Sequence, residues 1–233
     1  MKLVAGTFCT LVAFSAFADV VTDVKSAVVH LTAKQPVHGT FATEQTVKSA
    51  GKYANENTAR AATADVTHDA NGVSIVIPQN VIEKASEDSI NTIRSTEIIE
   101  ALNFRAPLLD LLNRATLKEE KRVLFGGKQT RLLVLSIRPT QRQQSGSIRI
   151  GSVKSDDQLR LWIGDDNLPL AGERVTTSTA GIMFLHGTYN SRVSYTFAHV
   201  ADRLILARME SSDSGSGMGQ NVAKTAVQTL TLR

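Results

Sequence analysis

The chain has 233 residues, of which 42% are hydrophobic, and 26 Lys and Arg against 22 Asp and Glu give a formal net charge of +4. This length suits one domain with a substantial core. Cys9 is the only cysteine, which excludes a disulfide scaffold and, once the first residues are removed, any thiol or thiolate-metal chemistry.

The first residues have the pattern of a secretory signal peptide. Lys2 precedes an apolar run over residues 3–14, and Ala16-Phe17-Ala18 gives the small-residue pattern of a cleavage site. A membrane anchor is the competing interpretation, but the apolar run is well short of the roughly 20 residues that a spanning helix needs. We therefore predict a signal peptide over residues 1–18, cleavage after Ala18 and a periplasmic location.

The next segment predicts a helix followed by a strand and a hairpin. Before Pro36, apolar residues recur at steps of three and four: Val21, Val24, Val28 and Leu31. Residues 37–46 alternate as a strand does, with Phe41 directed inward and a bulge expected at Gly39. Asn71-Gly72 then separates two strand-like runs, and this dipeptide readily takes the positive φ angles of a tight hairpin turn.

The middle of the chain predicts a helical insert around residues 95–115. Ser95 or Thr96 is expected to cap its first helix, with Glu97 in the first turn near the exposed backbone amides. Pro107 suits the first turn of a second, leucine-rich helix.

The same region is basic. Residues 105–149 contain ten Lys and Arg against three Asp and Glu. A solvated surface is one interpretation, and attraction to an anionic membrane surface or an acidic envelope protein is the other. Nucleic acid is not expected as a partner, because aromatic residues are sparse here and no nucleic-acid-binding motif is present.

Residues 132–137 predict an apolar strand, and from about residue 147 to residue 232 short alternating runs are separated by polar clusters. This is typical of antiparallel strands joined by direct turns. Turns are expected at residues 155–157, 165–167, 180–181 and 189–191, and a flexible loop at the glycine-rich residues 214–219. We predict an α+β fold, mainly β, with an antiparallel up-and-down sheet curved into an unclosed β-barrel and covered by the N-terminal helix and the insert.

No catalytic or metal motif is present. Residue types of a hydrolase triad occur, but none lies in a Gly-x-Ser-x-Gly turn: His186, His199, Asp202 and Ser216. The other histidines lack the spacing of metal ligands. The sequence therefore predicts no enzyme activity, no metal and no cofactor.

One segment resembles a known family. Residues 161–170, Leu-Trp-Ile-Gly-Asp-Asp-Asn-Leu-Pro-Leu, combine a strand ending in tryptophan, an acidic turn and a Leu-Pro step into the next strand. With the early helix and the central insert, this hairpin resembles those of LolA-like periplasmic proteins, which include lipoprotein carriers and sensors. The resemblance implies that residues 19–233 form a single LolA-like half-barrel domain with an apolar cavity for acyl chains.

We therefore predict a non-enzymatic carrier or binder of a lipid, an acyl chain or a lipid-modified protein. Burying an acyl chain contributes roughly 0.8 kcal/mol per methylene. The residues expected to line the cavity are Phe41, Ile98, Leu102, Leu108, Leu112, Leu133, Leu161, Trp162, Phe184, Tyr195 and Phe197. The alternative is an envelope protein with a filled core that docks a protein partner through its sheet or the basic residues 105–149.

Overall fold

The computed structural model describes residues 17–33, 35–51, 56–83, 86–139, 152–182, 185–217 and 219–233. Its elements in chain order are α1 (Phe17–Val29), β1 (Val37–Gly51), β2 (Glu56–Asp69), β3 (Gly72–Val76), α2 (Gln79–Ile82), α3 (Glu87–Ile90), α4 (Ser95–Leu102), α5 (Arg105–Asn113), β4 (Ala115–Phe125), β5 (Lys128–Ile137), β6 (Ser152–Ile163), β7 (Pro169–Ile182), β8 (Leu185–Val200), β9 (Arg203–Gly217) and β10 (Gln220–Leu232).

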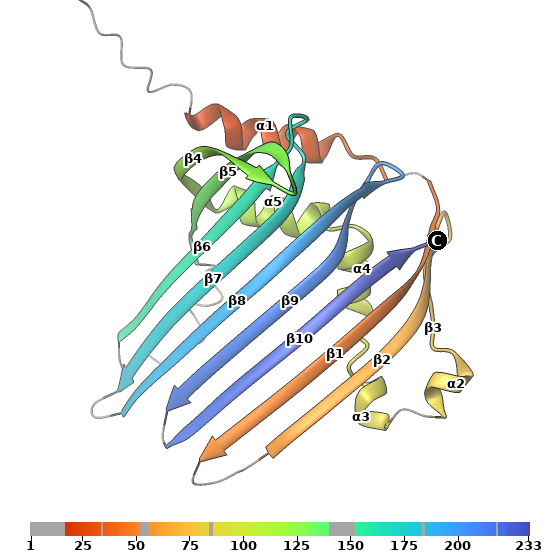
Figure 1. Cartoon of the computed structure of the whole chain (residues 1–233), viewed down its shortest axis with the longest axis vertical. Coiled ribbons are helices and arrows are strands. Elements are labelled where there is room, and N and C mark those ends of the chain that lie inside the picture. The colour runs from red at the N-terminus through yellow and green to blue at the C-terminus, as the bar shows by residue number, and fades with distance from the viewer. Residues whose placement is uncertain are drawn as a thin grey trace, which may run out of the picture.

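All ten strands form one antiparallel sheet in the order β3-β2-β1-β10-β9-β8-β7-β6-β5-β4 (Figure 1). The edge strands β3 and β4 are not paired with each other, so the sheet is curved but not closed. Eight of the nine pairings join strands that are neighbours in sequence, and the ninth joins β1 to β10. The predicted fold class, a mainly β fold with an unclosed antiparallel sheet, an N-terminal helix and a central helical insert, is confirmed.

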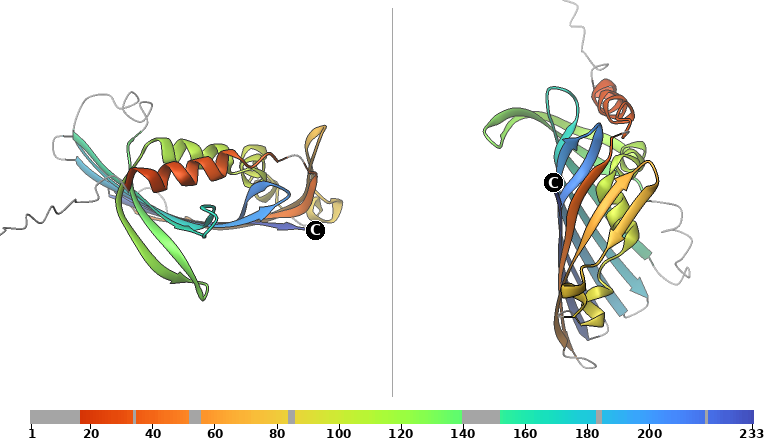
Figure 2. Two further views of the ribbon diagram at one scale, coloured as in Figure 1. Left: turned by 90° about the horizontal axis from the view of Figure 1, so that it is seen from above. Right: turned by 90° about the vertical axis from the view of Figure 1, so that its right-hand side faces the viewer.

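The longer helices cover one face of the sheet, and only toward one end of its strands (Figures 1 and 2). We call this face the helix side and the opposite face the outer side. The apolar stripe of α1, formed by Val20, Val24 and Val28, is buried, and α1 packs beside α5. The predicted amphipathic helix is therefore confirmed, and its stripe belongs to the main hydrophobic core. Of the four residues predicted for the stripe, Val21 is only partly buried and Leu31 follows the end of the helix, whereas Val20 belongs to the stripe and was not predicted.

The insert is attached to the sheet between its two helices. The backbone amide of Phe104 donates to the carbonyl oxygen of Leu204 in β9 at 2.8 Å. The cap predicted at Ser95 or Thr96 is wrong, because Arg94 occupies the N-cap position of α4 and makes no side-chain capping bond. Ser95 is already helical, so its hydroxyl cannot take the capping role, whereas Glu97 does lie in the first turn.

Three expected turns and one loop lie within strands. Residues 155–157, 180–181 and 189–191 belong to β6, β7 and β8, and residues 214–217 of the expected flexible loop belong to β9. These strands have 12 to 16 residues, and their far halves carry mostly polar or small residues on both faces. Polar clusters normally indicate turns, but here they mark sheet that extends beyond the helices. The turn expected at residues 165–167 does join β6 to β7.

The role predicted for Gly39 is also wrong. The expected bulge is absent, because the pairing of β1 with β2 continues past Gly39 without a shift and its pairing with β10 begins there in register. A Cβ atom at this position would lie 2.5 Å from the carbonyl oxygen of Thr231. Gly39 is therefore required by close backbone approach. The hairpin predicted at Asn71-Gly72 is present between β2 and β3, and Gly72 has a φ angle of +116°.

Strand β4 has no counterpart among the predicted elements. It pairs with β5 through a two-residue turn, Gly126-Gly127, in which both glycines have positive φ angles. Its central residues are mostly charged, so they show no apolar alternation.

Residues 1–16 lie outside the described residues, and cleavage after Ala18 stays a prediction. Among the described helices, none is both long and apolar enough to cross a membrane.

Candidate functional site

The residues predicted to line a cavity are largely packed against one another. Those in the main core are at most 9% exposed: Phe41, Ile98, Leu102, Leu108, Leu112, Leu133, Leu161, Tyr195 and Phe197. Trp162 was placed wrongly, because it alternates with the buried Leu161 and Ile163 and so points to the outer side. Phe184 lies outside the residues whose side chains are described.

Phe104 lies between the two helices of the insert and is buried in the main core, although no sequence pattern indicated it. Its ring centroid lies 5.5 Å from that of Tyr195 and 5.4 Å from that of Phe197. Burial raises the pKa of Tyr195, and the nearby Arg174 opposes that rise. A lone aromatic residue between two short helices gives no periodic signal, so only the three-dimensional contact reveals its role.

On the helix side, each of the strands β6 to β10 changes from apolar to polar residues along its length. Along β6, the positions facing this side run from Leu161 and Leu159 to Asp157 and Ser155. The register places Asp157 in one cross-strand row that continues through Thr176, Ser191, Asp213 and Lys224. Polar residues therefore occupy this row on all five strands, and on β9 and β10 they begin earlier, at Ser211 and Gln228.

We call the polar helix-side residues of this row and beyond it, together with Arg174 just before it, the polar zone. Its members come from β6 to β10: Ser155, Asp157, Arg174, Thr176, Ser178, Tyr189, Ser191, Asp213 and Lys224.

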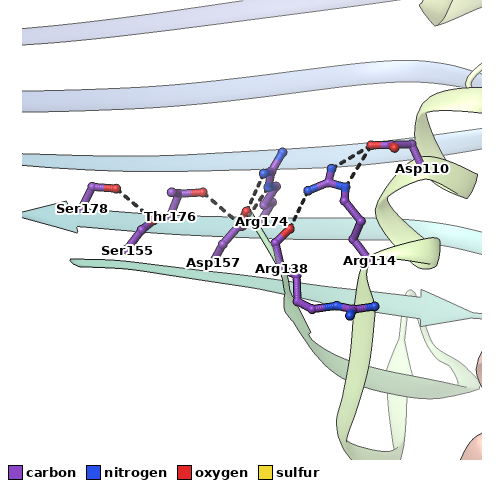
Figure 3. Close-up of polar contacts among 8 residues, drawn as sticks. All are labelled: Asp110, Arg114, Arg138, Ser155, Asp157, Arg174, Thr176 and Ser178. Carbon is purple, nitrogen blue, oxygen red and sulfur yellow. Dashed lines mark hydrogen bonds and ion pairs between the residues drawn. The ribbon is translucent and has the colours of Figure 1, made fainter. Parts of the chain in front are cut away.

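The Asp157 carboxylate accepts three hydrogen bonds from other residues of this zone (Figure 3). Arg174 donates to its two carboxylate oxygens at 2.9 and 2.5 Å, and the Thr176 hydroxyl donates to it at 3.2 Å. The Asp157 side chain is only 6% exposed. The two hydrogen bonds orient the guanidinium of Arg174 and raise its pKa above its usual range.

Two further contacts in Figure 3 border this pair. The Ser178 hydroxyl donates to the Ser155 hydroxyl at 3.1 Å on adjacent strands. At the end of α5, Arg114 donates to the Asp110 carboxylate at 2.7 Å and to the carbonyl oxygen of Arg138 at 2.8 Å. The second bond ties the end of the helical layer to the end of β5.

Tyr189 provides an aromatic surface in the polar zone. Its hydroxyl donates to the Asp213 carboxylate at 3.0 Å, and the residue remains 45% exposed. Partial burial raises the pKa of the Tyr189 hydroxyl, so it stays protonated at neutral pH. An exposed ring with a fixed hydroxyl is suited to contact with another polypeptide.

A groove on the helix side separates β1, β2, β9 and β10 from α3 and α4. Its volume is about 170 Å³, and its lining is mostly polar. The Arg60 guanidinium donates to the Asp88 carboxylate at 3.0 Å, and the Gln228 amide donates to the Glu97 carboxylate. This space is adjacent to the apolar core, but its chemistry is that of hydrogen-bonding groups.

A larger hollow of about 450 Å³ lies over the far ends of β1, β8, β9 and β10. Most of its lining comes from the outer side and consists of hydroxyl, amide and small side chains, including Thr188, Asn190, Ser214 and Ser216. The Ser216 hydroxyl is 2.8 Å from that of Thr188, whereas His199 lies at the opposite end of the β8–β9 ladder. The structure therefore does not bring His199 and Ser216 together.

Among the described residues, no group of three or more His, Cys, Asp or Glu side chains gathers as it would around a metal ion.

Comparison with known proteins identifies no family. No family model matches the chain, and no curated protein matches it. Among solved structures, the chain is similar to that titled "Crystal structure of MucB in complex with MucA(peri)", with 11% sequence identity over 92% of this chain and 93% of that chain and a TM-score of 0.20.

Proposed function

We propose that this protein is a non-catalytic binding protein that docks a protein partner on the polar zone. One observation carries the proposal, namely the row in which Asp157, Thr176, Ser191, Asp213 and Lys224 continue the helix side after the apolar core has ended. No described helix covers the far halves of β6 to β9, and Lys224 at the end of the row borders the groove beside α3 and α4 (Figure 1). A broad, structured surface of donors and acceptors complements a polypeptide, which offers both along its backbone.

The contacts within the zone support a preformed surface. Asp157 and Arg174 hold each other in place, and Tyr189 is fixed by Asp213. Such groups lose little side-chain entropy when a partner binds, which favours affinity. The partner that fits is a protein with a mostly uncharged polar surface, because the zone already pairs much of its own charge.

The carrier hypothesis receives less support. A lipid or acylated protein requires apolar volume between the sheet and the helices. The side chains expected to line that volume, such as Leu102, Leu112 and Leu161, are instead packed to 0% exposure. Of the spaces described above, the groove beside α3 and α4 is lined mainly by polar groups, and the larger hollow lies mostly on the outer side rather than between the sheet and the helices.

The test uses neighbouring residues on opposite faces of one strand. A photoreactive amino acid at Tyr189 should give a discrete protein adduct in cells, whereas the same group at Asn190, on the outer side, should not. Both positions are exposed, so accessibility is matched. Ser178→Arg should remove the Tyr189 adduct through steric blocking within the zone, and Thr177→Arg on the outer side should leave it unchanged.

Two results would overturn this proposal. One is equal adducts from Tyr189 and Asn190, and the other is an adduct that survives Ser178→Arg. Organic extraction of the protein purified without detergent supplies the comparison with the carrier hypothesis. A stoichiometric co-purifying lipid, with no adduct at Tyr189, would favour a lipid carrier instead.

A further inference from the structure

The β4–β5 hairpin bends out of the sheet on the outer side, away from the helices (Figure 2). Its turn, Gly126-Gly127, has positive φ angles at both residues, as in the tight turns that match strand twist. Near the turn, the Phe125 ring lies 5.5 Å from the Trp162 ring on β6. This contact fixes the end of the hairpin against the outer side.

The end of this hairpin exposes large apolar side chains. Leu124 is 69% exposed, the highest value among the exposed large hydrophobic residues of the described chain, and Phe125 is 37% exposed. Trp162 is partly exposed beside them. Aromatic rings at a protein surface, with an aliphatic residue beyond them, are the composition that membrane interfaces favour.

Cations flank this apolar end on both strands. Lys118, Arg122 and Lys128 are exposed, and within the described ranges none of them forms an ion pair. Arg122 faces Arg131 across the hairpin, and both border a hollow of about 430 Å³ that also includes Gln129 and Asp165. Arg131 is paired with Glu120 at 3.5 Å, whereas Arg122 is exposed and available to an anion.

We infer that the end of the β4–β5 hairpin is a contact site for an anionic lipid bilayer. Leu124 and Phe125 enter the interface between headgroups and acyl chains, while Arg122 and Lys128 approach the lipid phosphates. The apolar and cationic side chains together favour a bilayer over an acidic protein, because a purely electrostatic contact with an acidic protein would not use an exposed leucine beside the turn. The polar zone lies on the opposite face, so the hairpin and a docked protein do not compete.

The single tryptophan of the chain lies next to this contact and reports on it directly. The full chain is mixed with vesicles of phosphatidylcholine alone or of equimolar phosphatidylcholine and phosphatidylglycerol. With the anionic vesicles, Trp162 emission should shift to shorter wavelength and be quenched by brominated acyl chains. Binding should weaken as salt is added, because salt screens the attraction of surface cations to the bilayer.

Single substitutions distinguish the apolar contribution to vesicle binding from the electrostatic contribution. Leu124→Ser should weaken vesicle partitioning by about tenfold, because burial of its side chain in the interface is lost. Arg122→Ser and Lys128→Ser should each weaken it by about fivefold, which corresponds to the usual contribution of one cation near an anionic membrane. All three residues are exposed, so these variants should fold as the parent does.

Matched controls come from the far ends of the strands. Val222→Ser removes another exposed apolar residue, 41% exposed, and Lys48→Ser removes another exposed cation. Both should leave partitioning unchanged. The inference is wrong if anionic vesicles cause no shift or quenching, or if the controls weaken binding as much as the hairpin variants do. It is also wrong if Leu124→Ser has no effect while the protein binds polyglutamate through Arg122 and Lys128, since that identifies an acidic protein partner.

Discussion

The Arg203 guanidinium donates to Nδ1 of His68 at 2.8 Å and so links the start of β9 to the end of β2. Arg203 is 2% exposed and also donates to the carbonyl oxygen of Gln35 at 2.8 Å. Because Nδ1 accepts this bond, the imidazole of His68 is neutral with its proton on Nε2. Burial lowers the pKa of His68 below its usual 6.5, the Arg203 charge lowers it further, and Asp69 partly opposes them.

This relationship predicts that stability falls as the solution becomes acidic. The pKa of His68 is lower in the folded protein than in the unfolded chain, so the unfolded chain binds more protons as pH falls through 6.5. The contribution of His68 to the free energy of unfolding is complete above pH 6.5 and is lost as pH falls through the folded-state pKa. His68→Gln, whose amide oxygen can accept from Arg203, should lessen the loss between neutral and mildly acidic pH in urea titrations.

His30→Gln is the matched control, because His30 is exposed at the end of α1 and contacts only the Ser26 carbonyl oxygen among the described hydrogen bonds. The interpretation fails if His30→Gln and His68→Gln change the pH dependence equally.

A second prediction concerns adjacent residues of α4. Ile98 is fully buried and Ile99 is 48% exposed, so the same substitution tests opposite faces of one helix. Ile98→Ala should lower the free energy of unfolding by about 2–4 kcal/mol, because it removes core packing and leaves a cavity. Ile99→Ala should change it by no more than about 0.5 kcal/mol. Equal losses would contradict the assignment of Ile98 to a filled core.

The sequence correctly predicted those elements for which local chemistry and tertiary packing favour the same structure. The stripe of α1 and the Asn71-Gly72 turn are examples, because each carries its own signal in periodicity or backbone preference. It failed for β4, whose pairing is set by a partner strand rather than by apolar alternation. The sequence also predicted a turn at residues 189–191, within β8. A strand that extends beyond the core carries the polar residues that are otherwise typical of turns.

The candidate site was harder to predict for the same reason. Asp157 was expected in a turn, and nothing local to it indicates that Arg174 or Ser191 would lie beside it. The apolar residues were recognised as inward-facing because strand alternation requires it. Alternation alone does not distinguish a filled core from an open cavity, which depends on how closely the insert packs.

A third prediction compares the same substitution, glycine to alanine, at two positions within strands. Gly39→Ala should lower the free energy of unfolding by about 1–3 kcal/mol, because its new Cβ would lie 2.5 Å from the Thr231 carbonyl oxygen and the strands must shift. Gly215→Ala should be nearly neutral, since the nearest atom to its Cβ would be 3.6 Å away. Thermal and urea unfolding of both variants gives the comparison. A neutral Gly39→Ala would exclude close strand approach as the reason for that glycine.

The final prediction concerns the Asp157–Arg174 pair at the margin of the core. Asp157→Ala should lower the free energy of unfolding by about 2–3 kcal/mol, because it removes a nearly buried carboxylate and leaves Arg174 and Thr176 without their acceptor. The double variant with Arg174→Ala should lose less than the sum of the single losses, since the unpaired charge is also removed.

The Arg208–Glu210 pair is the matched control, with an N–O distance of 2.6 Å and both side chains about half exposed. Solvent screens this pair, so Glu210→Ala should change stability by no more than about 0.5 kcal/mol. Double-mutant cycles measured by urea unfolding compare the two pairs directly. Equal coupling energies would mean that Asp157 is solvated despite its low exposure, and the polar zone would then lack the preformed anchor on which docking of a protein partner depends.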